Sequence, residues 1–298
     1  MRVAVSGASG LIGSALCRAL EERGDHVVRL VRGTPQGGEV AWDPGSGAVD
    51  RQGLEGVEAA VHLAGAGIGD RRWTPARRAL LVSSRVDSTT LLAATLAGLE
   101  PQPRVLVNAS AVGIYGDRGA EELTEASPAG TGFLAELCRR WEAATAPAAA
   151  AGIRTVCLRS GIVLSRSGGA LARQMPLFRF GVGGRLGSGR QWVSWISITD
   201  EVNVVLHALD NETLSGPVNS VAPHPVTNAE FTSALGRAVH RPAVLAVPAP
   251  VLRLALGREL VDEALLASQR ALPAALHESG FAFSHPRVDS ALAEVVGG

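Results

Sequence analysis

Short apolar runs alternate with amphipathic segments up to about residue 222 of this chain. The runs have the length and β-branched content of buried strands, and they lie at residues 3–5, 27–31, 59–63, 104–108 and 155–164. Between the first two runs, apolar residues recur at helical spacing from residue 11 to residue 20, and a longer amphipathic pattern covers residues 73–96. This alternation predicts an α/β fold with a doubly wound parallel sheet.

The pattern changes in the last third of the chain. Extended segments return at about residues 195–222, Thr199 and Thr227 are candidate helix N-caps, and after Thr227 the chain reads as mostly helical. No linker or internal repeat separates independent domains. We therefore expect a core over residues 1–165 and a smaller, mostly helical substrate lobe over residues 166–298, with residues 195–222 returning to the core. The two parts are expected to form one integrated unit.

Three glycines follow the first apolar run in the pattern Gly7-x-x-Gly10-x-x-Gly13. Glycine lacks a Cβ atom, so a diphosphate can approach the backbone, and the N-terminus of the next helix offers unpaired N–H groups. A strand before the glycines and a helix after them predict a Rossmann-type dinucleotide site, with a purely structural turn as the alternative. The residues expected to contact the dinucleotide here are Gly7, Ser9, Gly10, Leu11, Ile12 and Gly13.

The residue that follows the second apolar run is Arg32. In NAD-binding folds an acidic residue near this position holds the ribose 2′-hydroxyl, whereas a 2′-phosphate requires positive charge. A guanidinium binds phosphate through two hydrogen bonds and stacks on adenine. Arg32 therefore favours NADP over NAD; the alternative is a solvated arginine at a strand end.

Composition narrows the classes of partner. The 298 residues include 28 acidic and 28 basic side chains, every basic one being arginine, so no global field attracts nucleic acid or an anionic membrane. No apolar run approaches the roughly 18 residues of a membrane span, and the first strand leaves no room for a signal peptide, so we expect a cytoplasmic protein. The three cysteines look like core residues, and the seven histidines show no metal-binding spacing, so no metal site is expected.

Two hydroxyl side chains follow the strand at residues 104–108. Ser110 and Tyr115 lie just past it, at the sheet edge where ligands bind in open α/β folds. His62, by contrast, lies inside a buried run and is expected to be a hydrogen-bonded interior histidine. Arg159 is expected either to pair with an acid or to contact a ligand.

Four motifs together resemble the extended short-chain dehydrogenase/reductase superfamily: the glycine pattern, Leu63-Ala64-Gly65, Ser110-x-x-x-x-Tyr115-Gly116 and Leu158-Arg159-x-Gly161-x-Val163-Leu164. Segments such as Gly187-Ser188-Gly189-Arg190-Gln191 and Trp195-Ile196 resemble its atypical branch, the epimerase family or nucleoside-diphosphate-sugar-epimerase-like proteins. The resemblance implies an NADP-linked oxidoreductase or epimerase whose substrate is not established. It also implies that the cofactor site includes Leu63, Ala64, Gly65, Arg85 and Ile162.

The superfamily's usual Tyr-x-x-x-Lys pair is missing from this chain. Counted from Trp141-Glu142, its two positions fall on Phe133 and Leu137 or, one residue later, on Leu134 and Cys138. Neither alignment supplies a proton donor of the right kind. Three residues could replace the missing acid by type: Ser110, Tyr115 and Glu136, of which Glu136 is better explained as a surface charge on a helix.

A glycine-rich segment at residues 180–191 carries Arg185 and Arg190 and is expected to form a lid over the site, with a flexible surface hairpin as the alternative. Two functions fit the whole pattern. One is an enzyme that exchanges hydride between NADP(H) and a carbonyl, alcohol or sugar-like small molecule. The other is a catalytically inactive NADP(H)-binding sensor or scaffold. Assembly as a homodimer is left open.

Overall fold

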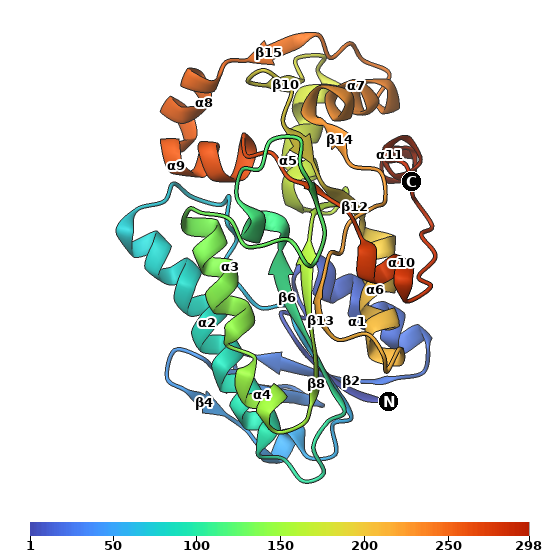
Figure 1. Ribbon diagram of the computed structural model, residues 1–298. Helices are drawn as coiled ribbons and strands as arrows, with labels where there is room; N and C mark the ends of the chain where they lie inside the picture. The colour runs from blue at the N-terminus through green and yellow to red at the C-terminus, as the bar shows by residue number, and fades with distance from the viewer. Residues whose placement is uncertain (298) are drawn as a thin grey trace.

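The computed structural model describes residues 1–297 and is built around an eight-stranded sheet (Figure 1). The strands run in the order β13-β8-β6-β5-β1-β2-β3-β4, and all neighbours are parallel except β3 and β4. Their bounds are β1 Arg2–Ser6, β2 His26–Val31, β3 Glu39–Asp43, β4 Ala48–Val49, β5 Ala59–His62, β6 Val105–Ala111, β8 Arg154–Ser160 and β13 Gly216–Val218. The predicted α/β class with a Rossmann-type doubly wound sheet is confirmed.

Helices cover both faces of this sheet (Figure 1). On one face lie α1 (Leu11–Glu22) and α6 (Ile198–Asp210), which bury Leu16, Leu20 and Val204 against strand residues such as Val5. On the other face lie α2 (Pro75–Ala97), α3 (Phe133–Ala143) and α4 (Ala146–Ala150). Successive strand side chains point to opposite faces, so a strand covered on both faces is apolar throughout, as the continuous runs indicated.

The remaining elements form a smaller lobe above the sheet together with short connecting pieces (Figure 1). They are η1 Gln52–Leu54, η2 Val112–Tyr115, β7 Glu122–Leu123, β9 Ile162–Leu164, α5 Gly169–Arg179, β10 Gly184–Leu186, β11 Trp192–Val193, β12 Trp195–Ser197, β14 Val226–Thr227, α7 Asn228–Ala238, β15 Leu245–Val247, α8 Ala249–Leu256, α9 Arg258–Leu260, η3 Val261–Leu265, β16 Arg270–Ala271, α10 Ala274–Glu278 and α11 Val288–Gly297. Helices α5, α7 and α11 share a separate apolar core. The exact division at residue 165 stays a prediction.

Two helices of the second half of the chain begin at a residue whose side chain caps the helix N-terminus, and one of these residues differs from the prediction. Thr227 caps α7 through a reciprocal pair of hydrogen bonds with Glu230, as expected. The N-cap of α6 is Ser197 rather than Thr199, because Ser197 keeps the extended backbone of β12 and its Oγ accepts from Asp200 N. Asp200 is fully buried and also accepts from Ser284 N and His285 N, so it fastens the C-terminal segment as well as the helix start.

The glycine-rich segment at residues 180–191 is an ordered part of the upper lobe. Its strand β10 pairs in parallel with β15, about sixty residues later in the chain, so the hairpin alternative is wrong. Gln191 is buried and donates to Leu186 O and Leu265 O. The lid role of Arg185 and Arg190, both exposed, stays a prediction.

Candidate functional site

The turn between β1 and α1 is shaped by its glycines. Gly7 has φ +68°, and a Cβ atom there would lie 2.8 Å from Leu63 C. A Cβ on Gly13 would lie 2.1 Å from Gly7 O, so only glycine fits at this position. The N-cap of α1 is Gly10, which has no side chain to occupy the free N–H groups. The backbone at this helix start is therefore free to bind an anion, and Ser9 and Gly10 are exposed beside it.

The end of β5 lies directly against this turn. Leu63 and Ala64 form the close contact with Gly7, and Gly65 follows on the exposed side. His62, one residue earlier, is fully buried, with Nδ1 2.5 Å from Ser6 Oγ and Nε2 3.1 Å from Ser88 Oγ. Burial lowers its pKa to about 3, so the ring is neutral. The prediction of an interior, hydrogen-bonded histidine is confirmed.

Arg32 extends from the end of β2 and is exposed. It lines a surface pocket of about 340 Å³ together with Gly33, Trp42, Asp43 and Asp50 among others. No ion pair of Arg32 occurs within residues 1–297. The guanidinium is thus free to contact a ligand, although two carboxylates share its pocket.

Ser110 and Tyr115 are brought together in one buried network with residues that the sequence analysis did not assign to the site. Ser110 Oγ donates to Glu142 Oε1 at 2.6 Å, and Arg159 donates to both oxygens of that carboxylate at 2.9 Å. Burial disfavours the Arg159 charge, but its hydrogen bond to Glu142 raises the guanidinium pKa above its ordinary value. The expectation that Arg159 pairs with an acid is confirmed.

Tyr115 is fully buried and its hydroxyl is surrounded by partners. The oxygen lies 2.7 Å from Asn219 Oδ1 and 3.0 Å from Thr124 O, and it accepts from Arg159 Nη1 at 3.0 Å. Burial raises its pKa. Glu136 is separate from this network, since it lies exposed on α3 in an ion pair with Arg139. That position favours the interpretation of Glu136 as a surface charge, and the catalytic role of each candidate stays a prediction.

The positions of the missing tyrosine and lysine are filled by apolar contacts. Phe133 packs against Trp73 with ring centroids 5.1 Å apart, and Arg78 lies 4.4 Å above its ring. Leu137 and Cys138 are buried, and burial raises the pKa of the Cys138 thiol to about 12. Neither alignment therefore places an acid or a base at these positions.

Two more features complete the carboxyl edge of the sheet. Glu201 is buried at the start of α6 and accepts from Ser160 Oγ and Ser220 Oγ, each at 2.6 Å. Ile162 begins β9, which pairs in parallel with β12, and its N–H donates to Ser194 O at 2.8 Å. Little in the sequence indicated that Glu142 and Glu201 belong to the site. Glu142 was marked only by its place after Trp141, and Glu201 only by its place in the first turn of a helix.

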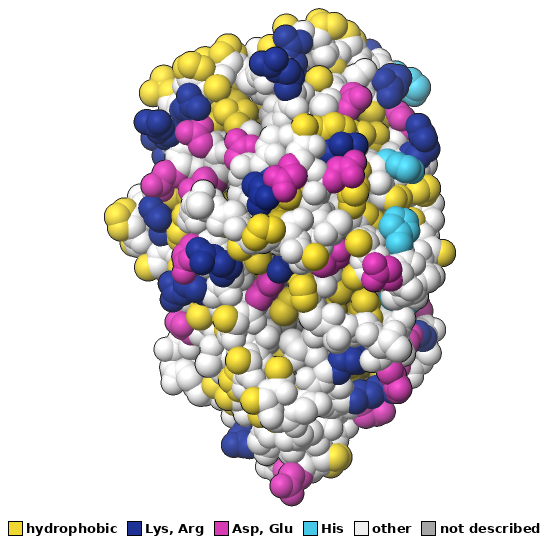
Figure 2. All heavy atoms as spheres, in the orientation of Figure 1, with side chains coloured by type: hydrophobic (Ala, Val, Ile, Leu, Met, Phe, Trp, Pro, Cys, Tyr) yellow, Lys and Arg dark blue, Asp and Glu magenta, His cyan; other side chains and the backbone are white. Residues whose placement is uncertain are grey.

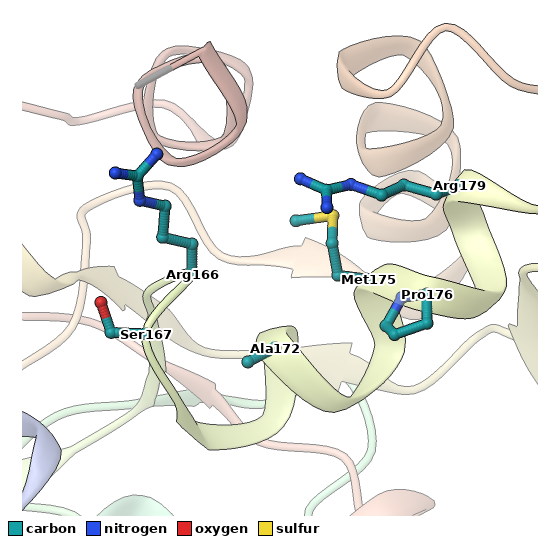
Figure 3. Close-up of a pocket in the computed structure, with 6 residues that line it drawn as sticks. All are labelled: Arg166, Ser167, Ala172, Met175, Pro176 and Arg179. Atoms are coloured by element: carbon teal, nitrogen blue, oxygen red, sulfur yellow. The ribbon is translucent and has the colours of Figure 1, made fainter.

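A surface pocket of about 380 Å³ lies along α5 (Figure 3). Arg166 rises from the loop before the helix and Arg179 from its last turn, with Met175 between them. None of the residues predicted for the site lines this pocket, and both arginines are exposed. The loop is nevertheless close to the glycine turn, because a Cβ on Gly169 would lie 3.2 Å from Leu11.

The face shown in Figure 2 mixes basic and acidic side chains over both lobes, in keeping with the balanced composition. Within the part of the chain that the structure describes, no helix is long and apolar enough to cross a bilayer. Among residues 1–297, no group of three or more His, Cys, Asp or Glu side chains could hold a metal ion.

The sheet order and the glycine turn place this chain in the class of Rossmann-type proteins. Residues 3–221 match the model of the NAD dependent epimerase/dehydratase family, and the chain belongs to that family. Residues 247–295 match a domain of unknown function, DUF1731. The predicted resemblance to the epimerase-like branch of the short-chain dehydrogenases is confirmed.

Similar proteins extend over nearly the whole chain. An epimerase family protein of Mycobacterium leprae is 47% identical over 291 residues, which cover 97% of this chain and 94% of that protein. The human epimerase family protein SDR39U1 is 38% identical over 299 residues, covering 99% and 100%. A crystal structure of human SDR39U1 (isoform 2) with NADPH has a TM-score of 0.91 at 35% identity and covers 100% of this chain and 99% of its own.

Proposed function

We propose that this chain binds NADP(H) at the glycine turn and catalyses hydride exchange with a carbonyl or alcohol group of a small, sugar-like molecule, as an oxidoreductase or epimerase. The observation that supports this proposal is the glycine turn at residues 7–13. A Cβ atom on Gly7 or Gly13 would clash with neighbouring backbone, and no side chain caps the N-terminus of α1. The crystal structure of the human relative with NADPH supports the same cofactor here. Bound NADP(H) would supply the hydride chemistry.

The cofactor contacts are proposed along the carboxyl edge of the sheet. Backbone N–H groups at the start of α1 would hold the diphosphate, and Arg32 at the end of β2 would pair with the 2′-phosphate. Leu63 to Gly65 would form the wall beside the cradle, and Ile162 would lie further along the edge, beyond β6 and β8.

Ser110 is the residue we propose to contact the reacting oxygen of the substrate. It lies at the carboxyl end of β6, and its proton is already directed to Glu142. When a substrate alcohol is oxidised, the serine can take the substrate's hydroxyl proton while giving its own proton to the carboxylate, which Arg159 holds in place. The reverse reaction starts from Glu142 that has taken up a proton from solvent. Tyr115 and Glu136 remain alternative donors.

The alternative function is a cofactor-binding sensor without catalysis, which the apolar residues at the usual tyrosine and lysine positions favour. NADPH oxidation followed at the nicotinamide absorbance, with aldehydes, ketones and nucleotide sugars as candidate substrates, separates the two. If one of these substrates is turned over and its turnover is slower in Ser110→Ala, the enzyme function is supported. The variants Tyr115→Phe and Glu136→Gln test the other two candidate proton donors in the same assay. Tight NADPH binding without oxidation by any candidate supports the sensor.

Cofactor preference is tested separately by titration with NADPH and NADH. We expect NADPH to bind more tightly, and Arg32→Ala to remove about 1.5–3 kcal/mol of that preference, the range for a hydrogen bond to a charged group. The variant should leave NADH affinity unchanged. A wild-type protein that prefers NADH would contradict the role of Arg32.

A further inference from the structure

Large apolar side chains that stay exposed are concentrated at one end of the upper lobe. Within residues 1–297 there are nine of them, and all but Leu80 on α2 lie between residues 177 and 256. Phe180 is 80% exposed and Val244 is 81% exposed, so both project from the surface. Apolar side chains are visible along the top of the molecule in Figure 2, where Figure 1 places β15 and α8. Such a concentration marks an interaction surface.

Five of these residues form one surface where the end of α5 meets the segment that leads into β15. Strand β10 follows α5 and pairs with β15, so that Gly184 lies opposite Leu245. The two segments also meet before the strands, because Arg241 Nε donates to Arg179 O at 3.2 Å. We call this surface the apolar tip, and it consists of Leu177, Phe180, Val182, Val244 and Leu245.

The charged side chains of the apolar tip are all arginines. Residues 143–199 and 231–258 contain no Asp or Glu, although acidic and basic residues balance over the whole chain. Arg179 and Arg241 belong to the tip, and Arg166 precedes α5; all three are exposed. None of them forms an ion pair within residues 1–297. The tip is therefore a local positive surface on a neutral protein.

The acidic residues of the neighbouring helices are engaged elsewhere. Glu230 closes the start of α7, Asp289 pairs with an arginine of α7, and Glu294 pairs with a histidine. Beyond β15, Asp262 pairs with the arginines of α8 and α9. None of these carboxylates forms an ion pair with the arginines of the tip, so their charge is available to an anionic partner.

The pocket along α5 shares Arg179 with the apolar tip (Figure 3). Arg166 and Arg179 reach into the space above the helix from its two ends, and Met175 lies between them. The pocket has a volume of about 380 Å³, and no Asp or Glu lines it. Guanidinium groups above an apolar floor suit a phosphate that is attached to an apolar body.

These features favour one kind of partner. At a two-fold contact with a second copy of the chain, the same patch meets itself, so arginines would face arginines without an acid between them. An anionic lipid bilayer instead offers phosphate groups to the arginines and acyl chains to the apolar residues that project. No helix among the described residues is able to span a bilayer, so the contact would be peripheral.

We propose that the apolar tip, together with Arg166, Arg179 and Arg241, binds the surface of an anionic lipid bilayer. Phe180 and Val244 enter the boundary between headgroups and acyl chains. The pocket along α5 takes the phosphate of one anionic headgroup. The surface lies on the upper lobe, away from the glycine turn, so the proposal is independent of the proposed activity.

Cosedimentation with sucrose-loaded vesicles tests the proposal, with phosphatidylcholine alone and with an equimolar mixture of phosphatidylcholine and phosphatidylglycerol. We expect the protein to bind the anionic vesicles and not the neutral ones, and added salt to weaken that binding. Phe180→Ser should weaken it about tenfold through lost apolar burial, whereas Phe180→Leu should retain most of it. Arg241→Gln should weaken it about fivefold, the effect of one basic residue near an anionic surface.

Two matched variants serve as controls. Leu80→Ser changes an exposed leucine outside the tip, and Arg237→Gln removes an exposed arginine of the same lobe that pairs with Asp289. Both should bind the anionic vesicles as the wild-type protein does. All substituted side chains are exposed, so the urea midpoints of these variants should stay close to that of the wild-type protein.

Several results would overturn the proposal. They are a lack of binding to the anionic vesicles, equal binding to both kinds of vesicle, and equal losses in Phe180→Ser and Leu80→Ser. Light scattering adds a further test: a dimer that Phe180→Ser abolishes would assign the tip to a second copy of the chain. NADPH affinity should be the same in every variant, so failure of the proposed function would be seen separately.

Discussion

Arg85 and Arg159 are both 8% exposed, yet the regions around them are built in opposite ways. Arg159 lies on β8, and its side chain donates to two carboxylate oxygens of Glu142 on α3, to a tyrosine hydroxyl and to a backbone carbonyl. Arg85 lies on α2, and its guanidinium donates to one backbone carbonyl and lies over one aromatic ring. The pKa of Arg159 is raised, and burial lowers that of Arg85. Arg159 therefore holds several groups in place, whereas Arg85 has no acidic partner within residues 1–297.

The largest expected effect comes from breaking the compensated pair. Glu142→Ala leaves Arg159 buried without its carboxylate, so we expect the free energy of unfolding to fall by about 3–5 kcal/mol. Glu136→Ala removes an exposed ion pair on the same helix and should cost about 0–1 kcal/mol. Urea unfolding of the two variants measures both values. Equal losses would show that the Arg159 pair is no stronger than a surface contact.

Glu201 extends the comparison to a buried anion that only hydroxyl groups compensate. Burial raises its pKa above the ordinary value of 4.5, so the folded state keeps the proton to higher pH than the unfolded chain does. Below the ordinary pKa, Glu201 is protonated in both the folded and the unfolded state, so it has no effect on how stability depends on pH. As the pH rises from the ordinary pKa to the raised pKa of the folded state, the free energy of unfolding falls. The stability of Glu201→Gln relative to wild type should therefore increase with pH across this window.

Urea midpoints of Glu201→Gln and wild type between about pH 4 and about pH 7 measure that trend. Glu278→Gln, which changes an exposed glutamate on α10, serves as the control. A difference between Glu201→Gln and wild type that stays constant with pH would mean that the two serine hydroxyls fully compensate the buried carboxylate.

The smallest expected effect is a local displacement of Arg85. A Cβ on Gly65 would stand 3.1 Å from Arg85 Cζ, so Gly65→Ala forces the guanidinium to move by a few tenths of an ångström. NADPH affinity should fall about three- to tenfold, less than the loss of a whole charged contact, because Arg85 is among the predicted cofactor contacts. Titration with NADPH checks this. Unchanged affinity would mean that Arg85 makes no contact with the cofactor.

The sequence predicted the sheet, the glycine turn and the family well, because each depends on neighbouring residues. Apolar runs identify strands, and a glycine pattern between a strand and a helix is a local signal. The start of α6 was misplaced by two residues, because Ser197 and Thr199 have similar capping side chains and only the backbone direction of β12 distinguishes them.

The candidate site was only partly predictable. Ser110 and Tyr115 were recognised because they follow a strand, but their partners Glu142, Arg159 and Asn219 come from α3, β8 and the end of β13. These contacts span from 32 to 104 positions along the chain. No local pattern encodes a pairing over such separations.

By itself the sequence determined that the chain forms a doubly wound sheet, that a glycine cradle follows its first strand, and that arginine is its only strongly basic side chain. Only the tertiary structure decided which arginines have an acidic partner. A buried arginine is compensated when a carboxylate from another helix or strand lies within hydrogen-bond distance of it. Within residues 1–297, packing placed Glu142 against Arg159 and placed no acid against Arg85.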